Sequence, residues 1–302
     1  MNRFQRSWLL LKTSLSVIGH NKELVIFPLV SFVCTAVIIL FFLAPSVLRP
    51  TGHAYTSAEH WQAISHSLFT NAGNNGNQTG FTPAAVAYLA FLYVLAMFIA
   101  TFCNVAFYHE ILGALNGEPV SIGRGLKFAG TRLGPILMWT LFAGVVGLII
   151  KTIEQRFSLV GRIIARLLGT VWSVAAVFVI PVIVRQEGAN PVAALQKSAG
   201  ILRRTWGEAL IGYAGLSFVN LVLFLGSIAS LVMTIVFASM VHLYFIVPLA
   251  VAGWLLGMFV WGYVSNVASH VYRGALYMYA AEGTVPQPYT AEILNLAWKY
   301  RK

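Results

Sequence analysis

The chain has 302 residues, of which 58% are hydrophobic and only 10% are Asp, Glu, Lys or Arg. Soluble domains usually carry about 25% charged residues, so the composition excludes an ordinary water-soluble globule and indicates a multi-pass membrane protein. The 20 Lys and Arg and the nine acidic residues give a formal net charge of +11. All nine acidic residues are Glu, and the absence of Asp excludes Asp-based magnesium sites, aspartyl-phosphate chemistry and a Ser-His-Asp relay.

Six apolar runs are long enough to cross a bilayer, for which about 20 apolar residues are needed. We predict membrane-spanning helices at residues 24–48, 83–108, 135–151, 163–184, 209–236 and 242–272. Residues 239–242 form a weakly polar turn between the last two runs, so two long helices are favoured over three short ones. The longest loop, residues 49–82, has a Gly- and Asn-rich tip, and residues 57–69 within it can form a short helix.

The positions of Lys and Arg predict how the chain is oriented in the membrane. Most of the 20 basic residues fall on one side of the membrane if the amino terminus is cytoplasmic. The outer side keeps Arg49, Lys151, Arg156, Arg162 and Arg166. Because loops rich in Lys and Arg stay in the cytoplasm, this bias predicts that both termini are cytoplasmic.

A basic amphipathic segment precedes each odd-numbered span. In the first segment, the apolar residues at helical spacing are Phe4, Trp8, Leu11, Leu15 and Ile18. Residues 122–133 and 192–206 repeat this design. Such helices lie in the membrane interface, where each basic residue near anionic head groups contributes about 1 kcal/mol. We predict an inner collar that binds anionic lipids or a partner protein through Trp8, Lys12, Arg124, Lys127, Arg203, Arg204 and Trp206.

The order of these segments predicts one membrane domain with three repeats of an amphipathic helix followed by two spans. The domain covers residues 1–302, and its repeats are residues 1–118 with the outer loop 49–82, residues 119–188, and residues 189–302 with a short cytoplasmic tail. Asn104-Val105-Ala106 in span two recurs as Asn266-Val267-Ala268 in span six, which supports a relation between the even-numbered spans. The expected fold is an all-α polytopic bundle of six transmembrane helices. An alternative role for the amphipathic helices is to connect the spans and pack on them.

Three short stretches resemble the opening and closing signatures of a family of uncharacterised bacterial six-span membrane proteins. They are Ser7-Trp8, the KELVIFP sequence at residues 22–28 and the YRGALYMYA sequence at residues 272–280. The chain is similar, more distantly, to the membrane domain attached to some bacterial glycerophosphodiester phosphodiesterases, whose soluble catalytic barrel has no counterpart here. The resemblance implies a location in a bacterial cytoplasmic membrane and supplies no catalytic residue.

The sequence contains no motif that indicates an enzyme. His-Glu-x-x-His, Gly-x-Ser-x-Gly and a phosphate-binding Gly-rich loop are all absent. His53, His60 and His66 form a cluster with Glu59 in the outer loop, but their spacing does not define a three-ligand zinc site. We therefore expect no enzymatic activity, no metal and no cofactor. The pI of about 9.9 does not indicate nucleic-acid binding, because the basic residues lie at membrane boundaries.

Several polar residues lie within or at the ends of the spans. Asn104, Asn220, Asn266 and His270 either make hydrogen bonds between helices or line a pathway. His109, Glu110, His270 and Arg273 lie near the predicted inner boundary, where we expect them to reach water. Gly253 and Gly257 form a Gly-x-x-x-Gly pattern, which indicates close helix packing within the chain or, as the alternative, an oligomer contact.

These observations favour a non-enzymatic membrane protein that acts as a scaffold or assembly component. Its expected partners are anionic membrane lipids bound by the inner collar, and another membrane protein or a second copy of the chain. The alternative function is a small-solute transporter or channel with a path among the repeats, near Asn104, Asn220 and Asn266.

Overall fold

The structure is a computed structural model that describes residues 3–71, 79–156, 159–188, 190–204, 206–290 and 294. Within these residues, six helical segments are long and apolar enough to cross a membrane: Lys22–Pro45, Pro83–Leu115, Leu133–Arg156, Gly161–Arg185, Val219–Met240 and Ile246–Glu282. They overlap the six predicted spans. The prediction of an all-α polytopic membrane fold is therefore confirmed.

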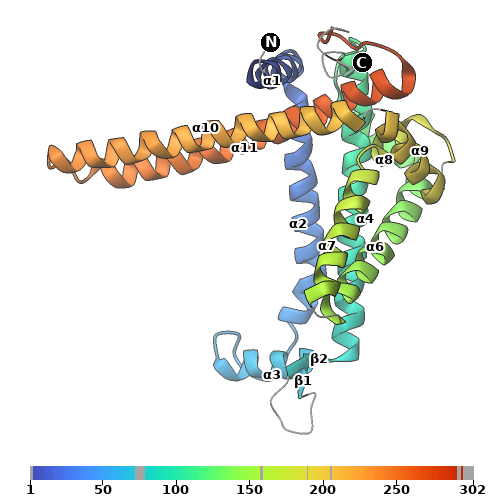
Figure 1. The fold of residues 1–302 in the computed structure, drawn as a ribbon. Coiled ribbons are helices and arrows are strands. Elements are labelled where there is room, and N and C mark those ends of the chain that lie inside the picture. Colours follow the sequence, from blue (N-terminus) through green and yellow to red (C-terminus); the bar gives the residue numbers. More distant parts are fainter. Residues whose placement is uncertain are drawn as a thin grey trace.

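Four of the spans run alongside one another in Figure 1. They are α2 (Ile26–Val47), α4 (Pro83–Leu115), α6 (Leu133–Arg156) and α7 (Leu159–Ala175). Helix α4 is central, because it contacts both α2 and α6, and α6 in turn contacts α7. Since α4 has 33 residues and about 20 cross the hydrocarbon, its last turns extend beyond the bilayer core.

The fourth predicted span is interrupted by a turn between α7 and the short helix α8 (Val179–Arg185). Ser198 of α9 (Pro191–Arg204) fills this break. Its hydroxyl accepts a hydrogen bond from the Phe178 N–H at 2.9 Å and donates one to the Ala175 carbonyl at 2.6 Å. Backbone groups freed by a break in an apolar environment need other partners, and Ser198 supplies them.

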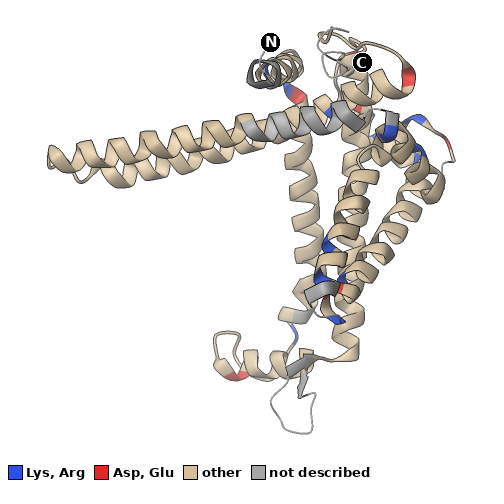
Figure 2. Ribbon diagram, in the orientation of Figure 1, with Lys and Arg blue, Asp and Glu red and all other residues tan. Residues whose placement is uncertain are grey.

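The last two spans form a long antiparallel hairpin of α10 (Trp206–Met240) and α11 (Ile246–Tyr277). Two long helices are therefore present, as predicted, and not three short ones. Figure 1 shows the hairpin running across the direction of α2, α4, α6 and α7. Residues 209–272 include no Lys, Arg, Asp or Glu, and Figure 2 shows the projecting part without charge. Such a surface needs hydrocarbon around it.

The densely packed part of the molecule is a cap at the end of α4 that lies near the first and last described residues (Figure 1). It contains α1 (Arg3–His20), η1 (Lys22–Val25), α5 (Ile122–Thr131), α8, α9, η2 (Met278–Glu282) and the adjoining ends of α4 and α11. The largest fully buried side chains include Leu11, Phe27, Ile111, Phe178 and Tyr277. Residues far apart in the sequence thus share one core.

Each short helix of the cap packs against longer helices. Helix α5 contacts α4, α9 contacts both α7 and α8, and α1 contacts α10 and α11. The spans also meet each other in the cap, where α4 contacts both α8 and α11. Gly274 permits a close crossing of α11 on α4, since a Cβ atom there would lie 2.7 Å from Ile111 Cγ2.

The opposite end of the molecule carries the long loop between α2 and α4 (Figure 1). It contains α3 (Ala58–Leu68) and two antiparallel strands, β1 (Phe69–Asn71) and β2 (Thr79–Phe81). The predicted short helix is present and begins after the N-cap Ser57, whose side chain accepts from the His60 N–H. The two strands were not expected from the sequence.

Candidate functional site

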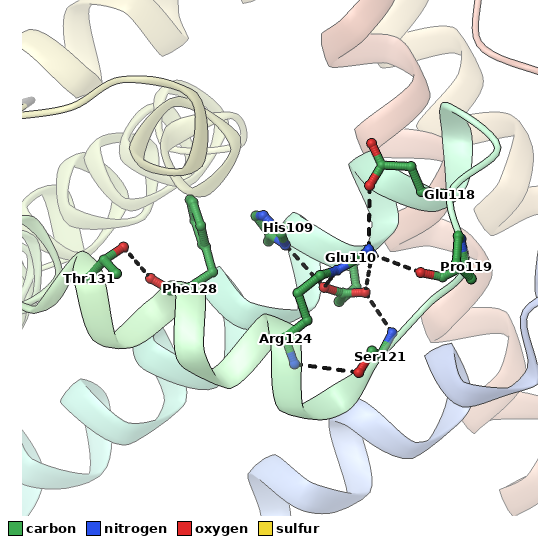
Figure 3. A network of polar contacts seen from close by, with 8 residues as sticks. All are labelled: His109, Glu110, Glu118, Pro119, Ser121, Arg124, Phe128 and Thr131. Atoms are coloured by element: carbon green, nitrogen blue, oxygen red, sulfur yellow. Dashed lines mark hydrogen bonds and ion pairs between the residues drawn. The ribbon is translucent and has the colours of Figure 1, made fainter.

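The first candidate site is a buried carboxylate near the cap end of α4, shown in Figure 3. Glu110 has no exposed surface. Its Oε1 accepts from Arg124 Nε at 2.9 Å, and its Oε2 accepts from a terminal nitrogen of Arg124 at 2.8 Å and from the Ser121 N–H at 2.7 Å. A bidentate Arg–carboxylate pair is among the strong charge-assisted contacts, and here it joins α4 to α5.

The segment that leads into α5 brings Arg124 to Glu110. Ser121 is the N-cap of α5, and its hydroxyl accepts from the Arg124 N–H at 3.5 Å. Arg124 also donates to the Pro119 carbonyl at 2.8 Å and lies 3.5 Å from a Glu118 carboxylate oxygen. The hydrogen bonds that Arg124 donates to Glu110 raise the pKa of the Arg124 guanidinium, which therefore stays charged.

Close packing of α5 on α4 accompanies the ion pair. The His109 ring stacks on Phe128 of α5 with 3.9 Å between ring centroids, and His109 Nδ1 lies 3.1 Å from Glu110 Oε1. Gly125 is buried against α4, and a Cβ atom there would lie 2.9 Å from the Ala106 carbonyl oxygen. A glycine is therefore required at this contact for the two helices to come this close.

The structure corrects the expectation that Glu110 reaches water. It is enclosed, and both of its carboxylate oxygens have hydrogen-bond partners. A fully paired, buried carboxylate has neither an open face for a substrate nor an unmet need for a metal. Glu110 therefore holds the cap together. No group of three or more potential metal-binding side chains occurs in the described part of the chain.

The predicted collar residues have different surroundings. Lys12, Lys127 and Arg203 are exposed and make no ion pair with any described residue. Arg124 is instead held by Glu110, which makes it a structural residue of the cap. The side chains of Arg204 and Trp206 lie outside the described residues.

Helix α1 buries a face that differs from the predicted one. Leu11 and Ile18 are buried as expected, but Trp8 is 43% exposed, while Leu10 and Ser14 are buried. This face contacts α10 and α11. Helix α1 is thus packed into the cap and does not lie apart from the spans as a separate interfacial helix.

The segment after η2 returns over α1. The hydroxyls of Tyr289 and Ser14 lie 2.7 Å apart in a buried hydrogen bond, and burial raises the pKa of Tyr289.

We expect Tyr289→Phe to lower the free energy of unfolding by about 1 kcal/mol, because Ser14 keeps its bond to the Leu10 carbonyl. Detergent titration followed by circular dichroism measures the change. Tyr93→Phe, at an exposed ring, is the control, and an equal loss in both variants would contradict a specific Tyr289 contact.

The second candidate site is a polar pocket of about 170 Å³, where the start of α2 meets the cap ends of α4 and α11. Asn104, Asn266 and His270 all line it, so three of the four polar residues singled out from the sequence come together. His270 Nδ1 lies 3.1 Å from the Tyr108 hydroxyl. Asn220 is elsewhere: its Oδ1 accepts from Trp261 Nε1 and Ser265 Oγ, each at 3.3 Å, which joins α10 to α11.

Gly253 and Gly257 lie on the projecting part of α11, and both are exposed. A Cβ atom at either position would meet no described atom within 4 Å. The predicted packing of this Gly-x-x-x-Gly pattern within the chain is therefore wrong for the described residues. The pair α10 and α11 is held instead by larger side chains, including Trp254, whose Nε1 donates to Ser227 Oγ at 3.2 Å.

Comparison with known proteins identified a family. The model of a family of unknown function, DUF6159, matches residues 83–286, which is more than half of the chain. Neither curated proteins nor solved structures matched the chain. The matched segment runs from α4 to the segment after η2, and therefore includes the Glu110–Arg124 pair and both asparagines of the polar pocket. The chain belongs to this family of unknown function, DUF6159.

Proposed function

We propose that this protein is a non-enzymatic scaffold or assembly component of the membrane, and that its cap binds anionic lipid head groups. One observation carries the proposal: the short helices α1, α5 and α9 present exposed cations without ion-pair partners in the described chain. These cations are Lys12, Lys127, Lys197 and Arg203. Four acidic side chains of the cap are already paired, with Glu110 and Glu118 on Arg124, Glu187 on Arg132, and Glu282 on Arg185. The free cations are thus available to head groups.

A recurring pattern of burial on the three short helices supports this proposal. Buried positions four residues apart recur on the three short helices, as Leu10 and Ser14, Gly125 and Ala129, and Ala194 and Ser198. Each helix therefore turns one face toward a span, while Lys12, Lys127, Lys197 and Arg203 are exposed. The two predicted roles of these helices, as connections and as a lipid-binding collar, are compatible.

We further propose a bacterial cytoplasmic membrane with both termini in the cytoplasm, and a distant relation to the membrane domain of glycerophosphodiester phosphodiesterases. Figure 2 supports a two-sided arrangement, since basic residues gather at the cap and again where α6 ends. The second group includes Lys151 and Arg156. The cap has the greater number of basic residues, which favours the cytoplasmic side for it.

The collar can be tested with Lys12→Gln combined with Lys127→Gln. At about 1 kcal/mol for each basic residue, we expect retention of anionic lipid relative to zwitterionic lipid to fall roughly thirtyfold. Mass spectrometry of lipids that remain bound after mild-detergent purification from mixed vesicles measures this ratio. Lys12→Arg with Lys127→Arg keeps both charges and should retain the lipid. An unchanged ratio in the Gln variant, or an equal fall in the Arg variant, would rule out the charged collar.

Solute transport is less well supported by this geometry. A path near the three asparagines would require Asn104, Asn220 and Asn266 to face one continuous space. Asn104 and Asn266 share a pocket, whereas the Asn220 amide oxygen is occupied by Trp261 and Ser265. A residue with this bonding stabilises the α10–α11 hairpin. Lipid binding therefore remains the proposal.

A further inference from the structure

The polar pocket contains hydrogen-bonding groups without partners among the described residues. The amides of Asn104 and Asn266 make no hydrogen bond with any described residue. Both lie in segments that are apolar enough to span a membrane. Asn104 is half-buried and Asn266 is exposed, so both amides are open to a hydrogen-bonding occupant of the pocket.

The chemistry of the lining limits that occupant. Ser31, Asn104, Asn266 and His270 offer donors and acceptors, and the residues that line the pocket include no Lys, Arg, Asp or Glu. The stacked rings of Phe27 and Phe107, 5.5 Å between centroids, form its apolar wall. A charged phosphate would lack a counter-charge here, whereas hydroxyl and ester groups match neutral amides. A volume of about 170 Å³ accommodates a small polar group of this kind.

Two other clefts between the helices are apolar by comparison. The cleft between α4 and α6 is lined by apolar residues that include Phe91, Phe98 and Leu137. The cleft between α7 and α9 is mainly apolar and includes Val171 and Leu202. Lipid chains alone would satisfy these two surfaces, but would leave the amides of the first pocket without partners.

The surroundings of the pocket indicate that its occupant carries apolar chains. Beyond the pocket, α2 exposes Leu29 and Phe32, and α11 exposes Leu256 and Phe259. On α2, Leu29 and Phe32 directly follow the pocket residues Pro28 and Ser31, and on α11, Phe259 lies seven residues before Asn266; both helices are spans. A membrane lipid can cover both surfaces at once, whereas a water-soluble polyol can fill only the pocket.

We propose that the junction of α2, α4 and α11 binds the uncharged hydroxyl- and ester-bearing part of a membrane lipid. The amides of Asn104 and Asn266 hydrogen-bond that part, and its acyl chains lie along α2 and α11. This site is independent of the basic collar, because it uses neutral groups and a different set of residues. Its failure would leave the proposal for the collar intact.

The test uses the full chain in vesicles that contain diacylglycerol, which is an uncharged glycerol lipid with one hydroxyl and two esters. We expect wild type to retain diacylglycerol through purification and to show a higher thermal unfolding midpoint when this lipid is added. Asn104→Leu combined with Asn266→Leu should reduce retention at least tenfold. Thr170→Val, which removes a hydroxyl from the cleft between α7 and α9, should retain the lipid like wild type.

Two further measurements separate the outcomes. Ser31→Ala removes one hydroxyl from the pocket and should reduce retention about threefold, so the proposal stays testable if the double variant does not fold. Wild type with free glycerol should show no rise in the unfolding midpoint. Equal retention of diacylglycerol by the Asn and Ser31 variants and wild type, or a full response to glycerol alone, would each overturn the proposal.

Discussion

Glu110→Gln is expected to destabilise the protein by about 3 kcal/mol. The substitution keeps the size of the side chain but removes the negative charge that Arg124 contacts through two nitrogens. Breaking a buried ion pair costs about 3 to 5 kcal/mol, and the lower end applies because the Arg124 side chain is 38% exposed. The free energy of unfolding in mixed micelles, from detergent titrations followed by circular dichroism, measures the effect.

A second carboxylate that pairs with Arg124 provides a matched control. Glu118 also pairs with Arg124, but its side chain is 55% exposed, so Glu118→Gln should cost no more than about 1 kcal/mol. Glu110→Gln combined with Arg124→Gln should lose less stability than the sum of the single changes, because the second change removes the charge left unpaired by the first. Equal losses for Glu110→Gln and Glu118→Gln would show that the buried pair does not hold the cap together.

Gly125→Val should destabilise the cap by about 3 kcal/mol, because a larger side chain forces α5 away from α4. The added Cβ would lie 2.9 Å from a backbone atom, the Ala106 oxygen, which cannot move aside as a side chain can. Separation of the helices would also lengthen the contact between Arg124 and Glu110. The free energy of unfolding and the protection of α5 amides against hydrogen exchange should fall together.

Gly130→Ala is the control for this substitution. Gly130 lies on the same helix, is exposed, and would meet nothing within 4 Å if it carried a Cβ. The higher helix propensity of Ala should leave stability unchanged or raise it by up to about 1 kcal/mol. If Gly125→Val behaved in the same way, the close approach of α5 to α4 would not be needed for stability.

The candidate sites could be predicted only in part. A single Glu within an apolar span requires a cation, but the sequence does not say which one, and Arg124 reaches Glu110 only through the turn that leads to Ser121. The recurring Asn-Val-Ala motif drew attention to Asn104 and Asn266, yet nothing local predicted that they line one pocket. A glycine adds nothing to a hydrophobic pattern, so the sequence did not identify Gly125, although it makes one of the closest contacts in the cap.

The membrane class, the six spans and the final long hairpin followed from the sequence alone, because hydrophobic run length and the absence of charge are local properties of a segment. The tertiary structure decided that Arg124 belongs to a buried ion pair, that Asn220 and Asn266 have different surroundings, and that α10 and α11 run across the other spans. These features depend on contacts between residues far apart in the chain, which arise only when the helices pack against one another.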